Sequence, residues 1–232
     1  MDKIHFIFIS PHFDDVALSC GGLVWHLTQQ SHLVEVWTLM AGLPPDGPYS
    51  DFANQIHLAW GMSGERAIRM RKAEDHAACD ILGAHARHFD WQDAIYRLDP
   101  SSGGALVNND EELFSRPLKD ALVEEIVRML DKEIPGEAKL VLPMGIGNHI
   151  DHRAVSLAGE KLGRTDYFYA DYPYILEDFE TPLFQERSLL KWPRVLSQEA
   201  LLYWQDAVLC YASQLSGFWR DIAEARSEEH TS

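Results

Sequence analysis

Blocks of apolar and polar residues alternate along this chain in a way that predicts strands and helices in turn. Residues 4–9 are an almost continuous apolar run, typical of a buried strand, and residues 15–30 place apolar side chains at helical spacing behind an acidic residue. Residues 33–40 are again apolar and β-branched. This strand, helix and second strand predict a βαβ unit, and therefore parallel strands in one sheet.

The same alternation continues along the rest of the chain. Helical periodicity predicts four further helices, over residues 65–82, 111–130, 153–162 and 198–214. Short apolar runs predict further strands, over residues 85–90, 138–142 and 167–170. Glycine, proline and aromatic residues mark segments 41–49 and 91–104 as irregular, and segment 172–193 as a small cap or extra hairpin. We therefore expect an α/β fold built on a mainly parallel sheet.

Length and charge narrow the class of protein. The chain has 232 residues, 46% of them hydrophobic, which suits one domain with one core, expected over residues 1–225. The formal net charge of -16 repels phosphate backbones and anionic membranes, so neither nucleic acid nor a membrane is an expected partner. Apolar runs are too short for a membrane span, and the three cysteines form no paired motif. These features predict a soluble, unprocessed cytoplasmic protein with free thiols.

The last seven residues, 226–232 (RSEEHTS), are expected to form a tail outside the domain. They match what a common sequencing-adapter oligonucleotide encodes in one reading frame, which suggests an artefact joined to the gene. The alternative is an ordinary polar chain end, and such ends are usually disordered.

Two polar clusters carry the candidate chemistry, because each follows a predicted strand and precedes a predicted helix. The first is SPHFDD at residues 10–15, and the second is HIDH at residues 149–152. The carboxyl ends of parallel strands meet at one edge of a sheet, where open α/β folds bind ligands. That edge would gather six polar side chains in one pocket: His12, Asp14, Asp15, His149, Asp151 and His152. Two imidazoles and one carboxylate with an open position are the ligand set of catalytic zinc, which leaves other groups free for proton transfer.

A simpler interpretation exists for each cluster taken alone. A histidine after a strand is more often a hydrogen-bonded loop residue than a ligand, and an aspartate at a helix start often only caps the helix. The recurrence of the same context in two distant parts of the chain favours the shared site.

Several other residues are expected to be structural. Gly21 and Gly22 lie inside a predicted helix, where each costs about 1 kcal/mol relative to alanine, and a close approach of that helix to the sheet would explain them. His57 and His88 have no metal-ligand spacing and are expected on the surface or in loops.

Together the motifs resemble those of the PIG-L or LmbE-like family of zinc-dependent N-acetylglucosaminyl deacetylases. PHFDD, with the following glycine pair, and HIDH are similar to the two signature motifs, although Phe13 replaces a common proline and Val16 a common glutamate. Further similarity lies in RKAE at 71–74, DAIYR at 93–97 and YASQ at 211–214. The resemblance implies a Rossmann-like three-layer α/β sandwich without a dinucleotide site, and no G-x-G-x-x-G follows the first strand.

The resemblance also implies a role for each polar residue of the two clusters. One zinc ion per chain would be held by three residues, His12, Asp15 and His152, although other divalent ions could substitute. Asp14 would be the general base that takes a proton from water. His149 would polarise the substrate carbonyl, and Asp151 would fix the tautomer of His149 and favour its charged form.

The substrate implied by the resemblance is a small N-acetylated sugar or sugar conjugate of the N-acetylglucosamine type, from which the enzyme would remove the acetyl group. Arg71, Asp93 and Arg97 are candidate substrate-binding residues, although surface salt bridges explain the two arginines about as well. Two alternatives remain open: an amidase for another small amide or thiol conjugate, and a non-catalytic module that binds a metal or ligand.

Overall fold

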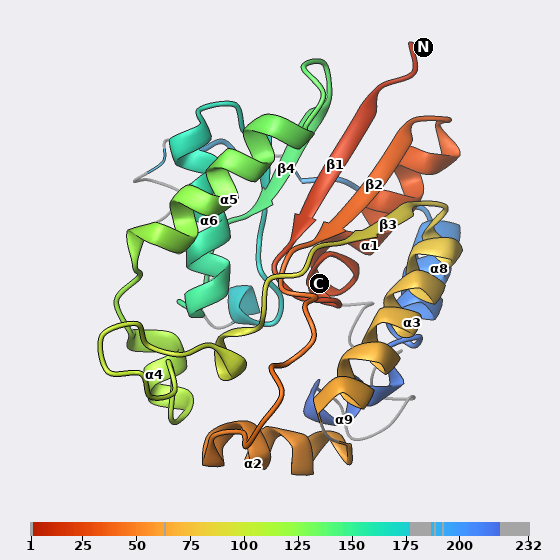
Figure 1. The fold of residues 1–232 in the computed structure, drawn as a ribbon. Helices are drawn as coiled ribbons and strands as arrows, with labels where there is room; N and C mark the ends of the chain where they lie inside the picture. The colour runs from red at the N-terminus through yellow and green to blue at the C-terminus, as the bar shows by residue number, and fades with distance from the viewer. Residues whose placement is uncertain (1, 63, 177–186, 188, 192, 219–232) are drawn as a thin grey trace.

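Five strands form one parallel sheet in the part of the chain that the structure, a computed structural model, describes: residues 2–62, 64–176, 187, 189–191 and 193–218 (Figure 1). In chain order they are β1 (His5–Ser10), β2 (Leu33–Thr38), β3 (His85–His88), β4 (Lys139–Pro143) and β5 (Tyr167–Tyr169). Their order across the sheet is β3-β2-β1-β4-β5, and each neighbouring pair is parallel. The prediction of an α/β fold with a mainly parallel sheet is confirmed.

The path of the chain changes direction across the sheet at β1. From β1 the chain adds β2 and β3 on one side, and it then crosses back to add β4 and β5 on the other. In such sheets, ligands bind at the carboxyl ends of the two strands between which the order reverses. Here those strands are β1 and β4, which pair directly through Phe6 with Lys139 and Phe8 with Val141. The two polar clusters therefore leave the sheet side by side.

Helices cover both faces of the sheet, because successive side chains of a buried strand point to opposite faces. In β1, Phe6 and Phe8 belong to one hydrophobic cluster, and Ile7 and Ile9 belong to the other. The helices of the first face are α1 (Asp15–Gln29), α3 (Gly64–Leu82) and α8 (Gln198–Val208), and those of the second are α5 (Asp120–Glu133) and α6 (Ile150–Leu162) (Figure 1). This is the three-layer arrangement that the resemblance implied.

Three features of the helices differ from the prediction. The helix expected over 111–130 is two helices, α4 (Asp110–Ser115) and α5, separated by Pro117, which lacks the N–H that a continuous helix requires. The helix expected over 198–214 is divided into α8 and α9 (Ala212–Phe218). In addition, α2 (Asp51–Trp60) was not predicted, and it begins where the Ser50 hydroxyl accepts the N–H of Ala53.

Contacts with α3 explain why α9 begins where it does. Both the backbone N–H and the hydroxyl of Ser213 donate to the Glu74 carboxylate, at 2.8 and 2.6 Å, so an N–H of the first turn has a partner from another helix. Just before α9, the Tyr211 hydroxyl donates to the buried carboxylate of Asp75 at 2.7 Å. The motifs at 71–74 and 211–214 therefore meet in space.

The glycine pair of α1 faces another helix, so the expected approach to the sheet is wrong. A Cβ atom on Gly21 would lie 2.7 Å from the Trp204 side chain in α8, and one on Gly22 would lie 2.4 Å from Leu196. The backbone of α1 is also kinked at Cys20, where φ is -153°, and the Trp204 indole N–H donates to the carbonyl of Ala17. The absence of side chains lets α8 pack directly on the backbone of α1.

Two expectations fall wholly or partly outside the described residues. Residues 177–186, 188 and 192 of the cap or hairpin expected over 172–193 are outside the described part of the chain. The tail 226–232 lies entirely outside it. The described residues of the former segment contain one short 3-10 helix, η2 (Tyr174–Leu176). Within the described ranges, no helix combines the length and the hydropathy needed to cross a membrane.

Candidate metal and catalytic site

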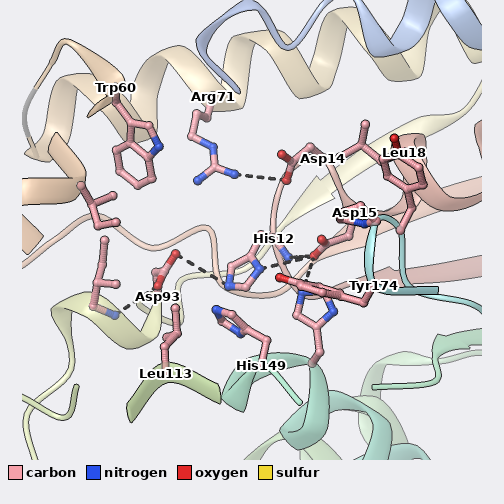
Figure 2. Close-up of a pocket in the computed structure, with 15 residues that line it drawn as sticks. His12, Asp14, Asp15, Leu18, Trp60, Arg71, Asp93, Leu113, His149 and Tyr174 are labelled. Atoms are coloured by element: carbon pink, nitrogen blue, oxygen red, sulfur yellow. Dashed lines mark hydrogen bonds and ion pairs between the residues drawn. The ribbon is translucent and has the colours of Figure 1, made fainter. Parts of the chain in front are cut away.

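The two polar clusters line one cavity of about 170 Å³ at the carboxyl ends of β1 and β4 (Figure 2). α6 begins three residues before its predicted start, with His149 as the residue that caps it, so Asp151 and His152 lie in its first turn. The polar residues of the clusters that line the cavity are His12, Asp14, Asp15, His149 and His152. Asp151 is fully buried behind His12. The structure therefore brings together all six candidate residues.

Asp15 lies at the spacing of a metal ligand from two histidines of the site. Oδ2 of Asp15 lies 3.4 Å from Nδ1 of His12 and 3.4 Å from Nε2 of His152. Tetrahedral ligands at about 2.0–2.1 Å from zinc lie about 3.3–3.4 Å from one another, so these separations fit such an ion. The backbone N–H of His12 also donates to Oδ2 of Asp15 at 2.7 Å, which holds the carboxylate in place.

Each of the two histidines has a carboxylate on its other ring nitrogen. Nε2 of His12 lies 3.2 Å from Oδ2 of Asp151, and Nδ1 of His152 lies 2.7 Å from Oδ1 of Asp171. Carboxylate partners of this kind orient metal-bound histidines and set their tautomers. Asp171 was missed by the sequence analysis. The available signal was its position directly after the strand predicted over residues 167–170, whose carboxyl end lies at the same edge of the sheet.

The carboxylate of Asp151 was expected to contact His149, but it contacts other groups. It accepts hydrogen bonds from the backbone N–H of Ala94 at 3.0 Å and from the side chain of Arg97, in addition to its contact with His12. Burial alone would raise the pKa of Asp151, but Arg97 and His12 hold it well below its usual value. Asp151 is linked to His149 through its backbone N–H, which donates to Nδ1 at 3.2 Å.

His149 is arranged as a neutral hydrogen-bond donor. Because Nδ1 accepts the N–H of Asp151, the ring proton of the neutral imidazole is on Nε2. Burial lowers the pKa of His149 well below 6.5, and the neighbouring His12 and His152 lower it further. Asp151 raises this pKa, as expected, but burial outweighs it, so the charged form is not favoured overall. A neutral imidazole can still donate Nε2–H to a carbonyl oxygen in the cavity.

Asp14 does not act as a side-chain cap of α1 within the described residues, although it occupies the capping position. Its Oδ1 instead accepts a hydrogen bond from the Arg71 guanidinium at 3.2 Å, and the residue lines the cavity. Burial raises the pKa of the Asp14 carboxyl group, while the charge of Arg71 opposes this increase. Asp14 is therefore a buried carboxylate beside the proposed metal ligands and has the placement of a proton acceptor.

The candidate substrate-binding residues occupy two kinds of position. Arg71 lines the cavity, is only 5% exposed, and stacks over the rings of Phe13 and Trp60 at 5.4 and 5.3 Å, so the surface salt bridge considered as its alternative is excluded. Asp93 also lines the cavity, with Oδ2 3.7 Å from Nε2 of His12. Arg97 is paired with Asp151 and does not belong to the described cavity lining.

Two histidines expected on the surface or in loops contribute to the packing near the site. His57 is buried in α2, where its Nε2 lies 2.8 Å from the Tyr96 hydroxyl and accepts the N–H of Gly64. His88 is at the end of β3 and contacts the buried carboxylate of Asp75 at 2.7 Å. Neither position could be read from ligand spacing, because both depend on contacts between distant segments.

Several known proteins with similar sequences and structures are named deacetylases. The chain is 30% identical, over an alignment 249 positions long, to a 2'-N-acetylparomamine deacetylase of Niallia circulans, and the alignment covers 97% of this chain and 86% of that one. It superposes with a TM-score of 0.75 on the zinc-inhibited form of the teicoplanin deacetylase Orf2, at 25% identity over 97% of this chain and 91% of the other. For the A40926 pseudoaglycone deacetylase Dbv21 the TM-score is 0.65, at 30% identity over 93% of this chain and 84% of the other.

The fold, the histidine and aspartate cluster and these relatives define the class of the protein, which is a hydrolytic N-deacetylase acting on N-acetyl amide bonds. The sequence model of the PIG-L family, described as GlcNAc-PI de-N-acetylase, matches residues 7–162. The chain belongs to the PIG-L family. The expectation of an N-deacetylase is confirmed. Two buried groups of side chains in the site could hold a divalent metal ion: His12 with His149 and His152, and His12 with Asp93 and Asp151.

Proposed function

We propose that this protein removes the acetyl group from an N-acetylated amino sugar conjugate, with one zinc ion held by His12, Asp15 and His152. The observation that carries the proposal is the spacing of the ligand atoms around Oδ2 of Asp15, at 3.4 Å from a nitrogen of each histidine. Both histidines also have a buried carboxylate on the opposite ring nitrogen, as catalytic zinc sites commonly do. An ion of this kind supplies a Lewis acid for an unreactive amide.

The residues around these ligands suit the proton transfers that amide hydrolysis needs. Asp14 would accept a proton from the attacking water and return it to the departing amine, which is a poor leaving group unless protonated. His149, neutral and protonated on Nε2, would donate a hydrogen bond to the carbonyl oxygen as negative charge develops there. Asp151 would act one step away, by holding His12 through its carboxylate and His149 through its backbone.

The relatives and the charge of the cavity support an amino sugar conjugate as substrate. The relatives named above include deacetylases of 2'-N-acetylparomamine and of teicoplanin, as their names state. Asp93 and Arg71 line the same cavity as the proposed ligands, and in this proposal they would contact sugar hydroxyls. The amine product is a cation, and a chain of net charge -16 favours its formation. An amide of a thiol conjugate remains the second candidate, because the same ligands would serve it.

Acetate release from a panel of substrates tests this function. Zinc-loaded protein is expected to release acetate from N-acetylated aminoglycosides or N-acetylglucosamine conjugates, and chelation followed by zinc addition should abolish and restore the release. Asp14→Asn is the matched control, because it should retain zinc and lose turnover. Zinc-loaded protein that cleaves a thiol-conjugate amide and no acetylated sugar would contradict the proposal.

A further inference from the structure

Asp171 accepts hydrogen bonds from both a proposed ligand histidine and the loop leading to the second polar cluster. It follows β5, is fully buried, and its Oδ1 lies 2.7 Å from Nδ1 of His152. We propose that Asp171 is a positioning residue of the metal site, which fixes the tautomer and orientation of His152. The inference rests on the proposed function only in taking His152 as a ligand.

The tautomer follows from the hydrogen-bonding capacity of the two groups. An ionised carboxylate only accepts hydrogen bonds, so the proton in this contact is on Nδ1 of His152. In a neutral imidazole the lone pair is then on Nε2, and Nε2 is the atom that lies 3.4 Å from Oδ2 of Asp15. Asp171 therefore directs the metal-binding lone pair toward the other ligand. Without it, either ring nitrogen of His152 could carry the proton.

The second oxygen of Asp171 holds the loop between β4 and α6. Its Oδ2 accepts the backbone N–H groups of Gly145 at 2.8 Å and Ile146 at 3.0 Å. Gly145 has a φ of +81°, a left-handed conformation that glycine adopts without strain, and this turn presents both N–H groups to one oxygen. The loop leads directly to His149, so a single carboxylate links the end of β5, this loop and the first turn of α6.

The geometry separates the two contacts of Asp171 experimentally. In Asp171→Asn, the amide oxygen can still accept the N–H groups of Gly145 and Ile146. The amide NH₂ would then face the Nδ1–H of His152, which places two donors against each other. Relief of that conflict requires the proton of His152 to move to Nε2, the atom that faces Asp15. The substitution therefore retains the loop contacts and disturbs the histidine.

Asp166 provides a matched control at the opposite end of the same pair of strands. Its carboxylate accepts the N–H of Leu140 at 2.9 Å and pairs with Lys139 at 2.6 Å, so it too holds backbone between β4 and β5. No contact with a histidine is recorded for it in the described part of the chain. Asp166→Asn therefore measures what the loss of a comparable structural carboxylate does.

The experiment is a competition between full-length protein and a chelator for zinc. Asp171→Asn is expected to weaken zinc binding by about 10- to 100-fold, as substitutions of such outer partners do, while Asp166→Asn leaves it within about twofold of the unsubstituted protein. Equal zinc affinity for Asp171→Asn and the unsubstituted protein would overturn the inference. Weak binding in Asp171→Asn matched by equally weak binding in Asp166→Asn would also overturn it.

A second measurement needs no variant of Asp171, so it applies even if Asp171→Asn does not fold. Nitrogen NMR of histidine-labelled, zinc-loaded protein, with the signal assigned through His152→Gln, is expected to show the His152 proton on Nδ1. A proton on Nε2 would refute the inference. The outcomes also separate it from the proposed function. Zinc binding that depends on Asp171 without acetate release contradicts only the function, and acetate release with unchanged zinc affinity in Asp171→Asn contradicts only the inference.

Discussion

Replacing Arg71 with methionine is expected to shift the acid limb of the pH–rate profile to higher pH. The Arg71 guanidinium donates to Oδ1 of Asp14 at 3.2 Å and is almost completely buried, so the two charges interact with little screening by water. Methionine has a similar length and can fill the space between Phe13 and Trp60, where the guanidinium now stacks. The substitution therefore removes the charge while it retains much of the packing.

The size of the shift follows from the environment of Asp14. Burial raises the pKa of this carboxyl group, and Arg71 is the largest influence that lowers it. A cation within hydrogen-bonding distance lowers the pKa of an aspartate by about 1–3 units, which is about 1.4–4 kcal/mol. Without Arg71 the pKa of Asp14 rises. Since a general base works only when deprotonated, kcat/KM should then begin to fall at a pH about 1–3 units higher than before.

The assay is kcat/KM for acetate release from about pH 5 to about pH 9, with zinc content measured at each pH. Arg71→Lys is the control, because it keeps a positive charge near Asp14 and should leave the acid limb within about 1 unit of its original position. Loss of an arginine that only binds substrate would lower kcat/KM by the same factor at every pH. An unmoved acid limb in Arg71→Met would therefore refute the electrostatic role of Arg71.

Three further predictions concern the metal site and the packing of α1. Asp14→Asn should retain zinc and lose about 10²- to 10⁴-fold in kcat, whereas Asp15→Asn should lose zinc and activity together. Metal analysis and rate measurements test this. Zinc loss in Asp14→Asn with zinc retained in Asp15→Asn would mean that the two carboxylates have the opposite roles. Burial alone would lower the pKa of His152, but Asp15 and Asp171 raise it to about 10. Zinc binding to stripped protein near neutral pH should therefore release protons and weaken as pH falls. Calorimetry in buffers of different ionisation enthalpy measures this release, and binding without it would contradict the prediction. Gly22→Val should lower the free energy of unfolding by about 1–3 kcal/mol through its clash with Leu196 and with Trp204 of α8. Gly136→Val, in open space, serves as the control in denaturant unfolding.

The two strand and helix units that carry the site could be predicted because their signals are local. The continuous apolar run before residue 10 and the shorter one before Pro143 each mark a buried parallel strand, and a polar cluster follows each directly. Once the strands are parallel neighbours, the clusters must meet. Helix boundaries were less certain because they depend on single residues, such as Pro117 dividing the segment 111–130.

The contacts within the site could not be predicted, since they join segments that lie far apart in sequence. Asp151 reaches His12 across 139 positions, although His149 is only two residues away from it. Asp171 is a lone aspartate among aromatic residues, and only the pairing of β4 with β5 brings it to His152. The helical periodicity of α3 indicates that it is amphipathic, but not that Arg71 faces a carboxylate in the interior.

The packing of Trp204 against α1 shows that the segment matched by the family model depends on residues that come later in the chain. The match to the family model ends at residue 162, and the described residues that line the cavity all precede residue 175. Yet the indole of Trp204 packs against the backbone at Gly21, and its N–H donates a hydrogen bond to the Ala17 carbonyl. Both residues belong to α1, the helix that begins at Asp15. A fragment that stops at the family boundary would expose that groove and leave the carbonyl to water. Substitutions in this late segment can therefore disturb α1, and with it the residues at the start of that helix, without changing a residue that lines the cavity.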